Sequence, residues 1–175
     1  MEDYGVVTEP DTMRVERLLP GPIERIWAYL TEPDKRAKWL AGGPMELRVG
    51  GRAESRFKHA DLSAEKTPPE KFRKMEGGHT LNCRITACGA PRLLSYTWGE
   101  DWGEVIFELL PRGKDVLLVV THRRLGDRGT IASVAGGWHA HLGILADRLH
   151  KREPQGFWSA YMRLEADYER RLANA

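Results

Sequence analysis

The sequence predicts an α+β fold in which an antiparallel sheet packs against a long helix near the C-terminus. Four strand-like stretches, 79–88, 92–98, 104–110 and 115–123, follow one another with only short turns between them. Connections this short favour antiparallel neighbours. Apolar residues then repeat at helical spacing over 131–149. Because the helix stripe and the apolar face of the sheet each need a partner, we expect them to pack together.

The N-terminal part predicts one strand and two short helices. Residues 14–19 have a strand's alternation, and Pro20-Gly21-Pro22 ends it. A helix is expected to follow at once, because a proline suits the first turn and residues 23–30 carry an i, i+3, i+4, i+7 apolar stripe. A second helical turn is expected over 34–38.

A hairpin and a long loop are expected next. Residues 45–49 and 52–58 read as two strands joined by Gly50-Gly51, since glycine supplies the positive φ values of a tight turn. The following stretch, 60–78, is polar, contains Thr67-Pro68-Pro69 and shows no sustained periodicity. We expect it to be a long, mobile loop.

The long helix contains two adjacent glycines, Gly136 and Gly137. Each costs about 1 kcal/mol relative to alanine inside a helix, so close approach of another backbone or of a ligand should compensate. On a helical projection His141 falls within the apolar stripe beside Trp138, whereas His139 falls at its edge.

A last amphipathic helix is expected beyond Pro154, where aromatic and leucine side chains recur at helical spacing. It either packs back on the domain or covers a partner subunit. The aromatic residues Phe157, Trp158 and Tyr161 look exposed, which leaves a homodimer through this helix, or another protein partner, as the second possibility.

Composition indicates one domain and excludes several classes of partner. The chain has 175 residues, with 27 Lys and Arg against 25 Asp and Glu, for a net charge of +2. The two signs are interspersed, so no nucleic-acid partner is expected. The first twenty residues have no apolar run, so we expect neither a signal peptide nor a membrane anchor, and a cytoplasmic location. The two cysteines are expected to be free thiols.

Several motifs in this order resemble the SRPBCC (START/Bet v 1-like) superfamily, and within it the branch of activator of Hsp90 ATPase homologue 1-like proteins. The resemblance covers roughly 14–149 and is carried by Pro22-Ile23-Glu24-Arg25-Ile26-Trp27 with Pro33 and Trp39-Leu40, Gly50-Gly51-Arg52, Leu93-Leu94-Ser95-Tyr96-Thr97-Trp98, Val119-Val120-Thr121-His122, and Gly137-Trp138 with Leu142 and Leu145.

This resemblance implies a helix-grip fold, a curved antiparallel sheet wrapped around a long C-terminal helix with a hydrophobic cavity between them. The expected organisation is a flexible N-terminal segment over 1–13, a helix-grip domain over 14–150 and a helical extension over 151–175. The resemblance does not fix an activity, because the superfamily hosts several functions on one fold.

The side chains expected to line the cavity are aromatic residues and histidines from the strands and the long helix. They are Trp39, Phe57, Tyr96, Trp98, Phe107, His122, Trp138 and His141. For each, filling of the core competes with contact to a ligand. His141 in particular could bond a backbone carbonyl, contact a ligand or act in catalysis.

The function expected from these observations is binding of a small hydrophobic or aromatic ligand in the cavity. A protein-interaction module akin to an Hsp90 co-chaperone domain, and an enzyme acting on a hydrophobic substrate, are the alternatives. No catalytic residue is assigned, because nucleophile elbow, phosphate-binding loop and Cys-x-x-Cys motifs are all missing from the sequence. No cofactor or metal is expected, because His139 and His141 diverge on a helix.

Overall fold

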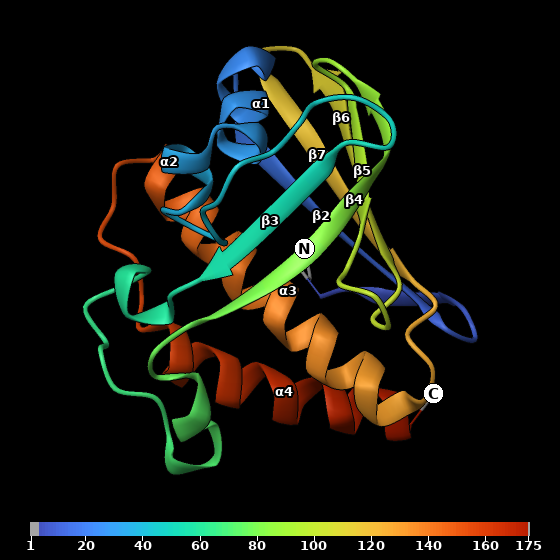
Figure 1. Cartoon of the computed structure of the whole chain (residues 1–175). Helices are drawn as coiled ribbons and strands as arrows, with labels where there is room; N and C mark the ends of the chain where they lie inside the picture. The colour runs from blue at the N-terminus through green and yellow to red at the C-terminus, as the bar shows by residue number, and fades with distance from the viewer. Residues whose placement is uncertain (1–3, 175) are drawn as a thin grey trace.

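The computed structural model describes residues 4–174 and has the expected α+β architecture, with a seven-stranded antiparallel sheet and two C-terminal helices (Figure 1). The sheet order is β1-β2-β7-β6-β5-β4-β3. The strands are β1 (Val6–Glu9), β2 (Thr12–Pro20), β3 (Arg52–Phe57), β4 (His79–Gly89), β5 (Leu93–Thr97), β6 (Glu104–Arg112) and β7 (Asp115–Arg123). The helices are α1 (Ile23–Thr31), α2 (Pro33–Arg36), α3 (Arg128–Leu149) and α4 (Phe157–Ala173), with single 3-10 segments η1 (His59–Asp61) and η2 (Glu70–Met75).

Strand β7 is central, between β2 and β6, which explains its nearly continuous apolar sequence. It pairs with β6 from Glu104↔Arg123 to Arg112↔Asp115 and with β2 from Met13↔His122 to Pro20↔Asp115. Alternate side chains of these strands are buried beneath α3. This register sets which strand residues face the helix and which face away.

Helix α3 crosses one face of the sheet, and α4 lies alongside α3 (Figure 1). The first turn of α3 is capped by Asp127, whose carboxylate accepts a hydrogen bond from the Thr130 amide at 2.8 Å. Phe157 and Trp158 of α4 are buried within the chain. The helix therefore packs back on the domain, with Tyr161 half-buried. A homodimer or another protein partner stays a prediction.

The N-terminal residues differ from the flexible segment expected over 1–13. Residues 6–9 form β1, paired with β2, and Met13 is buried. Val6 and Val7 are exposed on an edge strand, so the alternation that indicates a half-buried strand is missing there. Residues 1–3, which belong to the same expected segment, lie outside the described residues.

The hairpin expected from 45–49 and 52–58 is wrong in its first half. Within 45–49 the described chain has one isolated bridge to β3, Met45↔Ala53, and a second, Gly42↔Arg56, precedes this stretch. The Glu46 carboxylate accepts the Arg52 amide at 2.8 Å, so the chain turns back on itself instead of extending a ladder. Gly50 has the expected positive φ of 83°. Its amide bonds to the Ile85 carbonyl of β4.

The loop expected over 60–78 folds into η1 and η2 and packs against the start of α4. Ser63 Oγ accepts the Phe157 amide at 3.1 Å, and the Glu65 carboxylate accepts the Ser159 amide at 2.8 Å. These are first-turn amides, which have no partner within their own helix. The negative charge of Glu65 also suits the positive end of the helix dipole. The 59–78 segment is therefore tied to the N-terminus of α4.

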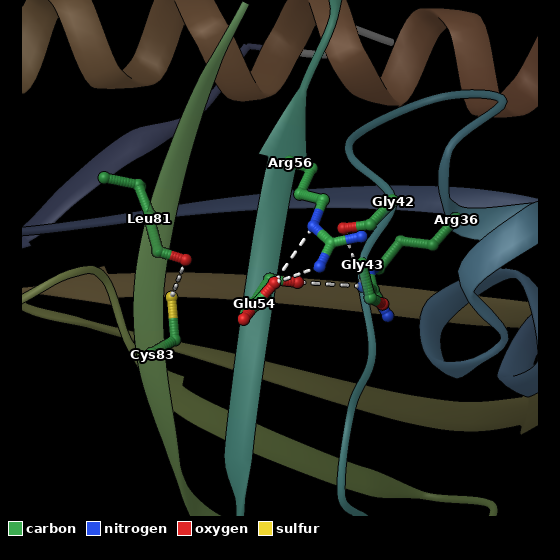
Figure 2. A network of polar contacts seen from close by, with 7 residues as sticks. All are labelled: Arg36, Gly42, Gly43, Glu54, Arg56, Leu81 and Cys83. Atoms are coloured by element: carbon green, nitrogen blue, oxygen red, sulfur yellow. Dashed lines mark hydrogen bonds and ion pairs between the residues drawn. The ribbon is translucent and has the colours of Figure 1, made fainter.

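A buried arginine holds the chain between α2 and β3. Arg36 is fully buried, and its guanidinium donates to the carbonyls of Thr31 and Ala41. It also donates to those of Gly42, Gly43 and Glu54 (Figure 2). A side chain at Gly43, which has φ of 103°, would lie 2.6 Å from the Glu54 carbonyl oxygen, so only glycine fits there. This network places Trp39 and Leu40 beneath α3.

Candidate ligand pocket

A cavity of about 260 Å³ lies between α3, the 59–78 segment, the first turns of α4, and the adjoining ends of β3, β4 and β5. It is called the pocket below. Its walls are mostly apolar and include seven large aromatic rings, those of Phe57, Phe72, Trp98, Trp138, Phe157, Trp158 and Tyr161. A cavity of about 150 Å³ lined by Leu, Ile and Phe can hold benzene, so this one has room for a larger aromatic molecule.

The two helix glycines are explained by different neighbours. A Cβ added to Gly136 would lie 3.1 Å from the Glu165 amide nitrogen and 3.2 Å from its Cα, so Gly136 lets α4 approach α3 closely. A Cβ added to Gly137 would meet no atom within 4 Å, and Gly137 lines the pocket. One glycine is used for helix packing, and the other leaves space in the pocket.

Four of the eight residues proposed from the sequence line the pocket. Phe57 comes from β3, Trp98 follows β5, and Trp138 and His141 come from α3. Trp98 and Trp138 lie with ring centroids 5.2 Å apart, and Phe57 contacts Trp98 edge-on at 5.6 Å. The sheet end and the helix therefore present one continuous aromatic wall.

Three of the other four residues lie behind that wall and do not line the pocket. Tyr96 is buried and stacks on Trp98 with centroids 6.2 Å apart, and Phe107 contacts Trp138 edge-on at 5.6 Å. Trp39 is buried, and its indole donates to the Tyr29 carbonyl at 2.7 Å. These side chains fill the core that supports the pocket.

The fourth, His122, orients Trp138. Its Nδ1 accepts the indole N–H of Trp138 at 3.0 Å, which leaves Nε2–H to donate to the Trp102 carbonyl at 2.7 Å. His122 is fully buried, and burial lowers its pKa from 6.5 to about 4. A neutral ring with both nitrogens bonded is a positioning group for the indole.

His141 lines the pocket from α3, and within the described chain only one of its two ring nitrogens is hydrogen-bonded. Its Nδ1 lies 2.8 Å from the Trp39 carbonyl oxygen, which can only accept, so Nδ1 carries the proton. Burial lowers the pKa of His141 to about 4, so the ring is neutral near pH 7 and Nε2 is a lone pair. Among residues 4–174, none hydrogen-bonds to this Nε2.

Two further histidines, His59 and His79, line the pocket and were not proposed from the sequence. The His59 ring centroid lies 5.8 Å from that of His141 and 6.0 Å from that of His79. The Nδ1 atoms of both are buried without a hydrogen-bond partner in the described part of the chain. Burial lowers the pKa of His59 to about 3 and also lowers that of His79. His59, His79 and His141 are called the histidine cluster below.

One signal in the sequence could have found His79, and none could have found His59. His79 pairs with Phe57 across β3 and β4, so strand register brings their rings to a centroid distance of 4.8 Å. His59 begins a segment without periodicity. It reaches the pocket only because Ser63 and Glu65 bind the start of α4.

A polar network around Glu165 adjoins the pocket through the lining residues Ser133 and Tyr161. This buried carboxylate accepts hydrogen bonds from Ser133 at 2.7 Å and Tyr161 at 3.1 Å, and pairs with Lys71 at 2.9 Å. Burial alone would raise the pKa of Glu165, but these three donors outweigh it and hold the pKa below its usual value. Phe72, beside Lys71, stacks on Trp158 with centroids 5.1 Å apart.

The donor groups of the described chain do not form a metal centre. Among residues 4–174, no group of three or more His, Cys, Asp or Glu side chains is arranged to hold a metal ion. In that same range, no helix is long and apolar enough to cross a membrane.

Comparison with known proteins places the chain beside proteins of one family. The family model described as activator of Hsp90 ATPase homolog 1-like protein matches residues 20–150. A Bordetella parapertussis protein solved by solution NMR is 44% identical, with a TM-score of 0.83 over 97% of this chain and 91% of its own. No curated protein matches the chain.

More distant structures share the fold. A conserved Enterococcus faecalis protein of unknown function is 20% identical, with a TM-score of 0.68 over 99% of this chain and 91% of its own. CalU16 from Micromonospora echinospora is 17% identical, with a TM-score of 0.67 over 90% of this chain and 86% of its own.

Proposed function

The chain belongs to the activator of Hsp90 ATPase homolog 1-like family, and we propose that it binds a small apolar or aromatic molecule in the pocket between α3, α4 and the sheet. The observation that carries the proposal is the cavity of about 260 Å³ walled by aromatic rings. Concave, mostly apolar sites with a few convergent polar groups are where proteins usually bind small molecules, so these walls favour an occupant.

The arrangement of α3 also supports a ligand role. Gly137 costs helix stability and makes no packing contact that would explain it, whereas Gly136 is explained by its contact with Glu165. Alanine at Gly137 would meet no clash and would favour the helix. A side chain at position 137 would instead reduce the space in the pocket.

The size of the pocket limits the ligand. Pockets that enclose drug-sized molecules measure about 300–1,000 Å³, so 260 Å³ favours a smaller compound of one or two rings. The apolar walls favour burial of an aromatic body, with about 25 cal/mol gained per Å² of apolar surface removed from water.

The experiment that tests this function compares a pocket-filling variant with a matched control. Gly137→Leu should abolish binding of a panel of one- and two-ring aromatic compounds, measured by thermal shift and native mass spectrometry. Gly143→Leu places the same side chain on α3 but lines a different hollow, and should bind like the wild type. Equal binding by both variants, or no binding by the wild type, would count against the proposal.

A further inference from the structure

The hydrogen-bonding state of His141 restricts what a ligand can present to it. The Trp39 carbonyl fixes the proton on Nδ1, because a carbonyl oxygen cannot donate. The opposite nitrogen, Nε2, is then an acceptor only. A group that satisfies it must carry an O–H or N–H.

The surroundings of the histidine cluster contain no charge that would reverse this state. His141 contacts Phe57 of β3, His59 of η1 and Phe157 of α4, at centroid distances of 6.3, 5.8 and 4.7 Å. His79 of β4 is the other titratable group acting on it. Among the residues that line the pocket, no acidic side chain is present.

The ionised groups nearest the pocket are committed elsewhere. Glu165 accepts from Ser133, Tyr161 and Lys71, so the protons of Ser133 and Tyr161, both lining residues, already have an acceptor. Unsatisfied hydrogen-bonding capacity is therefore concentrated in the histidine cluster. A buried polar nitrogen without a partner costs free energy, and a ligand that supplies the partner recovers it.

From this geometry we infer that the pocket selects an uncharged aromatic molecule carrying a hydroxyl or N–H group that donates to His141 Nε2, with His59 and His79 beside the same polar end of the ligand. The inference rests on the proposed function and specifies the ligand class. A carboxylate should be rejected, because its oxygens would face the His141 lone pair and would lose their hydration without gaining a donor.

The test uses three probes of matched shape, 2-naphthol, 2-methoxynaphthalene and 2-naphthoate, with phenol, anisole and benzoate as a one-ring series. By isothermal titration calorimetry at pH 7.5, the hydroxylated probe of the better-binding series should bind about tenfold more tightly than its methyl ether, as expected for one hydrogen bond. The carboxylate should bind most weakly. A carboxylate that binds best, or an ether that equals the hydroxyl compound, would overturn the ligand class while leaving the proposed function intact. Failure of all six probes would remove both.

A matched pair of variants assigns the preference to His141. In His141→Asn the amide can replace Nδ1–H toward the Trp39 carbonyl but offers no atom at the Nε2 position, so the hydroxyl preference should vanish while ether binding persists. His139→Asn changes the same helix where the ring bonds to Tyr168 outside the pocket, and should keep the preference. Retention of the preference in His141→Asn contradicts the assignment.

A measurement on the wild type keeps the inference testable if His141→Asn does not fold. Nitrogen-15 NMR of the histidine rings should show the Nδ1–H tautomer of His141. The Nε2 resonance should shift on addition of the hydroxylated probe and stay in place with its ether. An Nε2–H tautomer in the free protein would overturn the inference.

Discussion

The buried nitrogen atoms of Arg36 and those of the histidine cluster differ in their hydrogen bonding. The guanidinium of Arg36 is fully buried and donates to five backbone carbonyls, at 2.6–3.3 Å. In the histidine cluster, the Nδ1 atoms of His59 and His79 have no partner among residues 4–174. Arg36 therefore fixes the path of the chain, whereas the histidine cluster is left with hydrogen-bonding capacity beside an open space.

Structural and functional polar groups in this core differ in whether the protein itself supplies their hydrogen-bond partners. Buried polar groups are normally hydrogen-bonded, and the exceptions require an explanation. Arg36 follows this rule, because nearby backbone carbonyls accept hydrogen bonds from its guanidinium. The exceptions, His59 and His79, both line the pocket, where a bound molecule could supply the missing hydrogen-bond partners.

The largest expected effect that probes this comparison is acid destabilisation. The pKa values of His59, His122 and His141 are depressed from 6.5 to about 3, 4 and 4, so the unfolded chain binds more protons below pH 6.5. Their stabilising contribution is present above pH 6.5 and is lost as the pH falls toward 4, at about 1.4 kcal/mol per pH unit for each histidine. Urea unfolding between pH 7 and pH 4.5 measures the slope.

A single variant shows whether His141 belongs to that slope. His141→Asn should reduce the slope by about 1.4 kcal/mol per pH unit. A slope equal to that of the wild type in His141→Asn would mean that this ring is already charged in the folded protein.

The next effect concerns Arg36. Arg36→Leu should lower the free energy of unfolding by about 3–5 kcal/mol, because the carbonyls of Ala41, Gly43 and Glu54 would lose their buried donor. Arg56→Leu is the control, since its side chain is 60% exposed and pairs with the Glu54 carboxylate (Figure 2). That variant should change stability by under about 1 kcal/mol. Similar losses from both variants, by urea unfolding, would argue against a special role for the Arg36 network.

The adjacent glycines should respond to alanine with opposite signs. Gly136→Ala brings a methyl group to 3.1 Å from the Glu165 backbone and should destabilise the protein by about 1–3 kcal/mol. Gly137→Ala meets no atom within 4 Å and should stabilise α3 by about 0.5–1 kcal/mol. Thermal and urea unfolding of the two variants give the signs directly, and destabilisation by Gly137→Ala would show that its surroundings are tighter than described.

The smallest expected effect concerns the ion pair between Lys71 and Glu165 beside the pocket. Lys71→Ala should cost under about 1 kcal/mol, because the Lys71 side chain is 57% exposed and Glu165 keeps its bonds to Ser133 and Tyr161. Urea unfolding in low and high salt checks this. A loss of several kcal/mol would mean that the Lys71–Glu165 pair contributes far more than an exposed ion pair normally does.

The elements that the sequence predicts correctly are those with a clear apolar periodicity. Strands β4 to β7 and helices α3 and α4 were predicted within a few residues, because alternation and helical spacing reflect which side faces the core. The same spacing separated His141, which lines the pocket, from His139, which bonds to Tyr168. It failed at 45–49, where the Glu46 side chain takes the Arg52 amide that a second strand would have bonded.

Local spacing in the sequence was enough to predict strands β2 to β7, the four α-helices, their order, and the side of α3 that carries Trp138 and His141. Tertiary packing sets which candidate residues line the pocket. Tyr96 and Phe107, for example, are buried behind it. Tertiary packing also brings His59 and the start of α4 to the pocket, through hydrogen bonds that join residues 94 positions apart. These hydrogen bonds form where the 59–78 segment folds back onto α4. That segment has no periodicity, so no local pattern predicts its path.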